Sequence, residues 1–288
     1  MWNTLAVLMF CLADDSAAAT LLTQAGGEVK PPGGKTVTNV FFKDSSALTP
    51  DHFRAIAGLR SLKTLTMYNK CPLTDETLAP LGALQSLEEV EIDGAKISDD
   101  GMKAFAAMKS LRKLTFFHVL QKDKFTGAGV LHLKDLPKLE SFSCGGSTFT
   151  DDGLAACAKL PHLRELRIWH TNATDAGVAK LEKMTTLKIL HLGPQFTPKI
   201  TDASVSSACA IKSLETLSVM ETRLSWGKSL ARVKELPALK LLELHQDEIP
   251  DEDLAKLKQA LPASVKIDWS APSAEQKEWL KQNFDAKK

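Results

Sequence analysis

The sequence predicts a right-handed α/β solenoid, a horseshoe in which about ten short parallel strands line the concave face and short helices cover the convex face. Two observations predict this fold. A Leu-x-x-Leu-x-Leu strand pattern and a Thr-Asp helix start both recur along the chain, 24 to 28 residues apart. Repetition at a fixed period of this length is the signature of stacked supersecondary units that share one continuous core. Residues 37–269 are therefore expected to form one elongated domain.

Each expected strand is marked by three apolar residues at positions i, i+3 and i+5. The triplets are Val37/Val40/Phe42, Leu62/Leu65/Met67, Leu87/Val90/Ile92, Leu111/Leu114/Phe116, Leu139/Phe142/Cys144, Leu163/Leu166/Ile168, Leu187/Leu190/Leu192, Leu214/Leu217/Val219, Leu239/Leu242/Leu244 and a truncated Val265/Ile267. Side chains alternate across a strand, so the triplet residues are expected to point into the core and the residues between them to face outward.

Each expected helix begins at a Thr or Ser and carries one apolar residue at every third position. The clearest starts are Thr74-Asp75, Ser98-Asp99, Thr150-Asp151, Thr174-Asp175 and Thr201-Asp202. The hydroxyl suits an N-cap, and an Asp in the first turn suits the helix dipole. The repeated pair is therefore interpreted as helix capping rather than as chemistry. Gly101, Gly153 and Gly177, also in first turns, indicate close packing of helix against strand.

These triplets and helix starts resemble the leucine-rich-repeat family. They are most similar to its short subtype, found in ribonuclease-inhibitor-like, F-box-associated and many bacterial proteins. The resemblance covers roughly residues 37–268. In the family, Asn or Cys is common at the position after the strand. Here that position carries small or polar residues of several types: Ser45, Ala95, Ser147, Thr171, Thr222 and Asp247. No F-box-like segment occurs, so a ubiquitin-ligase function is not implied.

Composition and motifs predict a non-catalytic protein without a cofactor. Net charge is +1, with 36 basic and 35 acidic residues, which favours neither a nucleic acid nor an anionic membrane as partner. The five cysteines show no metal-ligand spacing, and neither HExxH nor Gly-x-Ser-x-Gly occurs. Cys144 and Cys157 are expected to be small buried hydrophobes; a disulfide between them is the alternative in an exported protein.

The N-terminal residues 1–22 are predicted to be a signal peptide, which implies export to the periplasm or the extracellular space. An apolar run over residues 5–13 is followed by small residues at 16–19. The absence of Lys or Arg before the run, together with Asp14-Asp15, argues against export. The alternative is a segment packed on the first repeat of a cytoplasmic protein. The nine-residue run is too short to span a membrane. Residues 23–36, rich in Gly and Pro, are expected to be a linker.

The C-terminal residues 270–288 are expected to form a helix that covers the last repeat. Trp279, Leu280 and Phe284 lie on one side of the predicted helix, and a solenoid needs its terminal repeat covered. A docking helix for a partner is the alternative.

A candidate binding site is predicted on the concave face of the middle repeats. Its residues are Phe117, His118, Gly145, Gly146, Arg167, Trp169, His170, His191 and Phe196. With neighbouring strands about 4.8 Å apart, Phe117 and Trp169 would stand roughly 9–10 Å apart over a glycine floor and could hold a planar or aliphatic group. Insertions after Phe116 and Leu192 are expected to wall the site.

Several interpretations of this face stay open. The aromatic rings could fold over the glycines and close the gap without a ligand. The acidic trio Glu89, Glu91 and Asp93 could meet a basic partner or be an ordinary solvated surface. The expected function is binding of a protein or peptide. Carbohydrate or cell-envelope binding, with sugars stacked on Trp169 and Phe117, and an intracellular adaptor or enzyme inhibitor are the alternatives.

Overall fold

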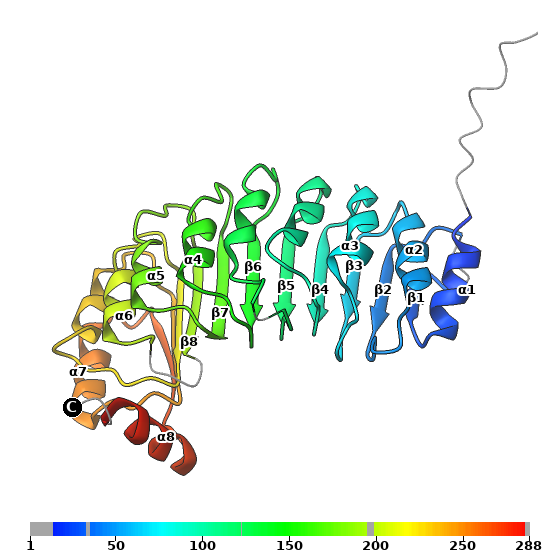
Figure 1. Cartoon of the computed structure of the whole chain (residues 1–288). Helices are drawn as coiled ribbons and strands as arrows, with labels where there is room; N and C mark the ends of the chain where they lie inside the picture. The colour runs from blue at the N-terminus through cyan, green and yellow to red at the C-terminus, as the bar shows by residue number, and fades with distance from the viewer. Residues whose placement is uncertain (1–13, 33–34, 122, 195–198, 286–288) are drawn as a thin grey trace, which may run out of the picture.

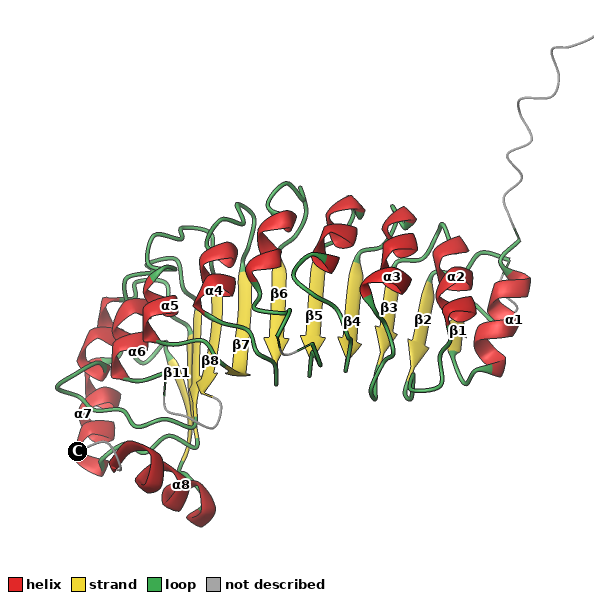
Figure 2. Cartoon of the chain, viewed as in Figure 1, coloured by secondary structure: helices red, strands yellow, loops and turns green. Residues whose placement is uncertain are grey.

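The computed structural model of the chain describes residues 14–32, 35–121, 123–194 and 199–285. Its strands form one sheet in which every strand pairs with its neighbours in the sequence, and the helices cover the outer side of a curved stack (Figures 1 and 2). The stack curves because packed helices stand 8–10 Å apart whereas paired strands stand about 4.8 Å apart. The strands therefore line the concave face.

The sheet contains eleven strands. They are β1 (Glu28–Lys30), β2 (Asn39–Phe42), β3 (Thr64–Met67), β4 (Glu89–Asp93), β5 (Lys113–Phe117), β6 (Ser141–Gly145), β7 (Glu165–Thr171), β8 (Ile189–Pro194), β9 (Thr216–Met220), β10 (Leu241–His245) and β11 (Lys266–Ser270). The pairs from β2 to β11 are parallel and in register, so Val40, Leu65, Val90 and their equivalents form one buried row. The ten parallel strands predicted from the triplets are confirmed.

Helices alternate with these strands, and many are short. They are α1 (Ser16–Gln24), α2 (Pro50–Gly58), α3 (Asp75–Leu78), α4 (Asp151–Cys157), α5 (Asp175–Ala179), α6 (Asp202–Ala208), α7 (Asp251–Ala260), α8 (Ala274–Asp285) and four 3₁₀ helices, η1 (Ala79–Ala83), η2 (Gly101–Ala107), η3 (Ala128–Leu133) and η4 (Leu230–Glu235). A 3₁₀ helix has three residues per turn, so an apolar residue at every third position stays on one buried face.

The first strand and helix lie where a terminal segment and a linker were expected. Strand β1 pairs antiparallel with β2, although residues 23–36 had the composition of a linker. Helix α1 buries Ala19 and Leu22, and Asp15 Oδ2 accepts the Val37 N–H at 2.7 Å. These contacts cover the exposed side of the first parallel strand, as a terminal repeat requires. The apolar run 5–13 of the predicted signal peptide lies outside the described residues.

The Thr caps are confirmed, but the Asp beside each cap has a further role. Thr74, Thr150, Thr174 and Thr201 each accept a backbone N–H at the start of their own helix. The adjacent Asp reaches the cap of the next repeat: Asp75 accepts from Ser98, Asp99 from Thr126, Asp151 from Thr174, Asp175 from Thr201 and Asp202 from Ser225. The Asp side chains thus link neighbouring repeats along the stack.

Two of the three first-turn glycines, Gly101 and Gly177, face the preceding repeat rather than the strand. A Cβ on Gly101 would meet the side chain of Asp75, and one on Gly177 would meet Asp151. Gly153 instead lies under the ring of Phe149. The expectation of close helix–strand packing was wrong at these positions, because the crowding comes from side chains of the neighbouring turn.

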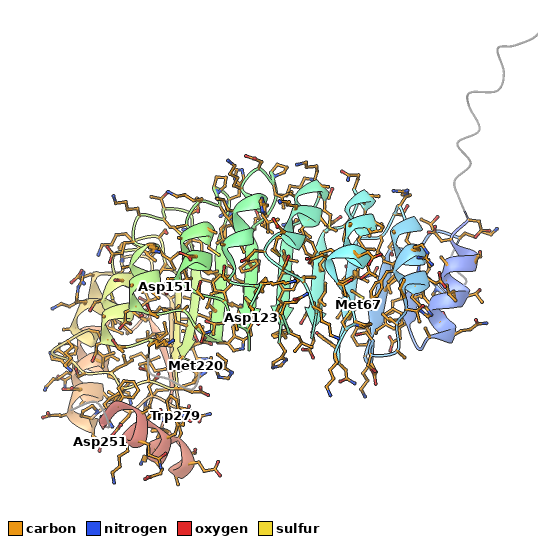
Figure 3. All side chains as sticks on the ribbon, viewed as in Figure 1. Met67, Asp123, Asp151, Met220, Asp251 and Trp279 are labelled. Atoms are coloured by element: carbon orange, nitrogen blue, oxygen red, sulfur yellow. The ribbon has the colours of Figure 1, made fainter. Side chains whose placement is uncertain are left out.

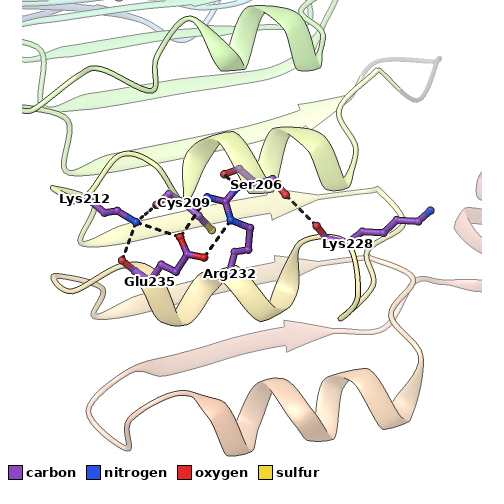
Figure 4. A network of polar contacts seen from close by, with 6 residues as sticks. All are labelled: Ser206, Cys209, Lys212, Lys228, Arg232 and Glu235. Carbon is purple, nitrogen blue, oxygen red and sulfur yellow. Dashed lines mark hydrogen bonds and ion pairs between the residues drawn. The ribbon is translucent and has the colours of Figure 1, made fainter.

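The convex side carries polar links between repeats as well as apolar packing (Figure 4). Arg232 of η4 donates to the Ser206 carbonyl of α6 at 3.0 Å, and Lys212 and Arg232 both contact Glu235. Lys212 Nζ also donates to the Cys209 carbonyl at 2.8 Å. Cys71, Cys144, Cys157 and Cys209 are all buried and free, so the alternative of a Cys144–Cys157 disulfide is not realised. Burial raises the pKa of the Cys71 thiol to about 11 and of the Cys209 thiol to about 12.

Helix α8 lies within residues 270–288, where a C-terminal helix was expected, and buries Leu280. It runs beneath the rim where the strands of the later repeats end (Figure 1). The guanidinium of Arg223, which follows β9, lies 5.4 Å from the ring centroid of Phe284. The helix therefore forms part of the rim beside the concave face.

Candidate functional site

The two aromatic rings of the predicted site touch each other, so the open gap predicted between them does not exist. The ring centroids of Phe117 and Trp169 are 5.7 Å apart, with a tilt of 58° between the planes. The indole lies directly over Gly145: a Cβ built there would stand 2.6 Å from Trp169 Cε2. The expectation of an empty slot was wrong because Trp169 leans across the glycine. The alternative, in which the rings close the gap, is the observed geometry.

A second glycine on the other side of Trp169 is covered in the same way. Gly193 of β8 is paired with Trp169 in the sheet, and a Cβ there would stand 2.7 Å from Met220 Cγ. Phe117, Gly145, Trp169, Gly193 and Met220 thus form one apolar row across β5 to β9, which we call the concave strip. The side chains of Phe117, Trp169 and Met220 are half-buried, so the strip remains open to solvent.

The predicted site included Phe117, Gly145 and Trp169 but not Gly193 or Met220. Both occupy the position directly after a strand triplet, the same register position as Trp169. The signal was therefore present in the alignment of the repeats. It was missed because a sequence cannot show which way a large side chain leans over a neighbouring glycine.

In four of these repeats the residue directly after the strip position adopts a left-handed turn conformation, and in three of them it is polar. His118, Gly146, His170 and Glu221 all have positive φ, between 49° and 61°. His118 Nδ1 lies 2.8 Å from Asp93 Oδ1, and His170 Nε2 lies 3.0 Å from Glu221 Oε2. The hydrogen bond to Glu221, together with its charge, raises the pKa of His170 despite the opposing effect of burial.

A charged cluster lies in the middle of the concave face, two residues before the strip on each strand. Arg167 of β7 is bonded to Glu165 and lies 3.1 Å from His191 Nδ1 on β8. Burial and the positive charge of Arg167 lower the pKa of His191 to about 4, so this imidazole is neutral at physiological pH. Glu243 Oε2 of β10 lies 3.7 Å from His191 Nε2. Because the imidazole is neutral, this contact is not an ion pair.

A pocket of about 430 Å³ opens between this rim and helix α8. It is lined by His118, Gly146, His170, Pro194, Glu221, Gln276 and Trp279. Figure 3 labels Trp279 on α8 and Met220 at the end of β9, the residue before Glu221. We call this cavity the rim pocket. Its volume falls in the range of about 300–1,000 Å³ typical of ligand sites. Pro194, Glu221, Gln276 and Trp279 were not among the predicted site residues.

The inserted loop after β5 does not wall the site in the way the sequence suggested, and most of the insertion after Leu192 lies outside the described residues. In the loop after β5, Val119 and Phe125 are buried in the core, and Leu120 is exposed. This insertion fills the interior of the repeat because its apolar residues pack beside Phe116. Phe196, the remaining predicted site residue, lies outside the described residues.

The described part of the chain offers neither a metal centre nor a membrane-spanning helix. No group of three or more His, Cys, Asp or Glu residues among residues 14–32, 35–121, 123–194 and 199–285 is placed to hold a metal ion. Over the same ranges, no helix is long and apolar enough to cross a bilayer.

Comparison with known proteins identifies the architecture. No protein-family model matches the chain, and no curated protein matches its sequence. Among solved structures, an internalin (inlF) from Listeria monocytogenes is similar, with a TM-score of 0.51 and 19% identity over 76% of this chain. The match spans 64% of that internalin.

Two further structures align less closely. Internalin C2 from Listeria monocytogenes has a TM-score of 0.49 and 18% identity, covering 90% of this chain and 92% of that one. A leucine-rich-repeat protein from Leptospira interrogans has a TM-score of 0.49 and 16% identity, covering 78% and 58%. At this identity the first likeness shows the fold alone. Together with the eleven-stranded sheet and its interleaved helices, it establishes that this chain has the leucine-rich-repeat solenoid fold.

Proposed function

We propose that the chain is a non-catalytic scaffold that binds a protein or peptide on its concave face, with the concave strip as the anchor of the interface. The observation that carries this proposal is the solvent-open apolar row Phe117, Trp169 and Met220 across five strands. Aromatic residues and Met are enriched at the centre of protein interfaces, where a few large anchors supply most of the binding energy. Solenoids present extended concave surfaces for such partners.

The surroundings of the strip support this role. The Arg167 cluster lies on one side and the polar turns at His118 and His170 lie on the other. An apolar centre bordered by polar groups is the usual anatomy of a protein interface.

Variants of Trp169 test the proposal. Trp169→Ala removes the central ring of the strip, whereas Trp169→Phe keeps an aromatic anchor. We expect a partner captured by the wild type to bind the Ala variant at least about tenfold more weakly and the Phe variant nearly normally. Leu131→Ala is the matched control, because Leu131 is an exposed apolar residue on η3. Thermal melting must show that the variants are folded. Equal capture by Trp169→Ala would contradict the proposal.

We further propose that the repeats belong to the short ribonuclease-inhibitor-like subtype and that the protein is exported. The repeat length of 24 to 28 residues supports the subtype, and the apolar run at residues 5–13 supports export. Cell fractionation of the host, with an antibody against the solenoid, tests the location. Recovery of the full-length chain in the cytoplasm would contradict export.

A further inference from the structure

The concave face carries a net charge opposite to that of the rest of the chain. At the outward-facing positions of strands β2–β11, six residues are acidic (Glu89, Glu91, Asp93, Glu165, Glu243 and Asp268) and three are basic (Lys113, Arg167 and Lys266). This face therefore has a formal charge of −3. The whole chain has +1 with neutral histidines, so all remaining positions together carry +4.

Two of the basic side chains on this face are already paired with carboxylates. Arg167 is bonded to Glu165, and Lys266 Nζ lies 3.9 Å from Asp268 Oδ2. The excess acidic charge is consequently concentrated on β4 and β10, the strands on either side of the concave strip. Asp93 is paired in the sheet with Phe117, the first residue of the strip. At the other end Met220 is paired with His245, two residues after Glu243 on the same strand. An apolar anchor with carboxylates on both neighbouring strands favours a basic partner.

The rim pocket supplies a specific place for one cationic side chain. Glu221 directly follows Met220, so the pocket begins one residue beyond the strip. The Glu221 carboxylate is 26% exposed, and a carboxylate accepts up to about four hydrogen bonds, of which His170 uses one. Trp279 lines the opposite wall, and the face of an indole ring attracts a cation. The amide oxygen of Gln276 adds a neutral acceptor.

We propose that the partner presents a basic segment that places an apolar side chain on the concave strip and a Lys or Arg side chain in the rim pocket, between Glu221 and Trp279. This inference rests on the proposed function, since it specifies the chemistry of the partner that the strip would bind. The cation forms charge-assisted hydrogen bonds with Glu221, which are stronger than neutral ones. The surrounding acidic face accelerates encounter with a basic segment.

A selection from a phage library of random linear peptides, with the full chain as bait, tests the inference. We expect the selected peptides to combine Lys or Arg with a neighbouring apolar or aromatic residue. Synthetic copies should bind the wild type in fluorescence anisotropy and lose about tenfold in affinity with Glu221→Gln. This substitution is compatible with the turn, because Gln246 occupies the equivalent position of the next repeat with φ 59°. The control is Glu252→Gln, which removes the same charge from an exposed carboxylate on α7.

A double-mutant cycle locates the contact. Replacing the selected Lys or Arg of the peptide by Gln should weaken binding to the wild type but have little further effect on the Glu221→Gln variant, because both changes remove the same interaction. Equal weakening by Glu252→Gln and Glu221→Gln would overturn the pocket contact.

The two proposals fail in different ways. Selected peptides that depend on Trp169 but carry no excess of Lys or Arg would overturn the basic partner and leave the proposed binding face intact. Selected peptides whose binding is unchanged by Trp169→Ala would overturn the binding face and, with it, this inference.

Discussion

The indole of Trp169 occupies the space that a side chain at position 145 would need, with Trp169 Cε2 only 2.6 Å from a Cβ built on Gly145. This relationship joins neighbouring strands β6 and β7 and brings Trp169 into contact with Phe117 on β5. The glycine therefore determines the shape of the concave strip. It lets the large ring lie over the backbone of β6, where the Trp169 side chain stays half-buried.

Gly145→Ala should destabilise the protein by about 1–3 kcal/mol and displace Trp169, because the new methyl group overlaps the indole. Urea unfolding measures the free energy, and tryptophan fluorescence reports the altered environment. Gly58→Ala is the control, since nothing lies within 4 Å of a Cβ at that position. If Gly145→Ala changed the unfolding free energy no more than Gly58→Ala does, the ring would not rest on Gly145.

Asp151→Ala should destabilise the stack by about 1–3 kcal/mol, because it removes the acceptor of the Thr174 N–H and hydroxyl in the next repeat. Asp152→Ala is the matched control: it lies in the same first turn of α4 but is exposed. Both substitutions remove a favourable interaction with the helix dipole, but only Asp151→Ala removes the bonds to the next repeat. The difference between their unfolding free energies in chemical denaturation therefore measures the inter-repeat bonds. Equal losses would indicate that the dipole alone accounts for the Asp.

Asp247→Asn should stabilise the protein at neutral pH. Asp247 is wholly buried, one oxygen accepts the Thr222 N–H at 2.9 Å, and the other lacks a partner among the described residues. Burial raises the pKa of this carboxyl well above its ordinary value. The folded protein thus binds the proton more tightly than the unfolded chain does. Stability is fully present below the unfolded pKa of about 3.9 and falls as the pH rises toward the folded pKa.

Asparagine has no such titration, so the gain in unfolding free energy from Asp247→Asn should grow as the pH rises above the unfolded pKa of about 3.9. Denaturant unfolding at several pH values measures it, with the exposed Asp251→Asn as control. Parallel stability curves for wild type and Asp247→Asn would contradict the prediction.

Glu221→Gln should lower the pKa of His170 toward about 6.5, because the bond to Glu221 is the main cause that raises it. NMR titration of the ring protons measures this shift. A histidine with a raised pKa adds stability below its unfolded pKa, and that stability is lost as the pH rises through the folded pKa. The pair is half-exposed, so the contribution is only a few tenths of a kcal/mol. An unchanged His170 titration would rule out the pairing in solution.

If the protein is exported, cleavage should leave Asp15 in the mature chain. Asp15 Oδ2 accepts the Val37 N–H, and Ala19 and Leu22 of α1 are buried, so a cut among residues 16–19 would divide a packed helix. N-terminal sequencing of the mature protein tests this. A mature end at or beyond residue 16 would remove Asp15 and contradict the packing of this segment as part of the solenoid.

The repeat register could be predicted from local patterns alone. The triplets from Val40 to Leu242 mark buried strand positions because side chains alternate across a strand whatever surrounds it. The Thr caps followed from the same local logic, since Thr150 bonds to a backbone N–H two residues away. Periodicity and capping depend on short stretches of chain, and these properties were therefore readable from the sequence.

Contacts between repeats were decided by the tertiary structure. Asp151 faces Thr174 of the next repeat, Trp169 leans over Gly145, and Trp279 of α8 meets the rim beside Glu221. Each contact depends on rotamers and on the curvature of the stack, and it joins residues 23 or more positions apart. The sequence by itself thus determined the solenoid and the location of its concave face. Only three-dimensional packing closed the predicted aromatic gap and created the strip and the rim pocket, because side-chain direction is set by neighbours that are distant in the chain.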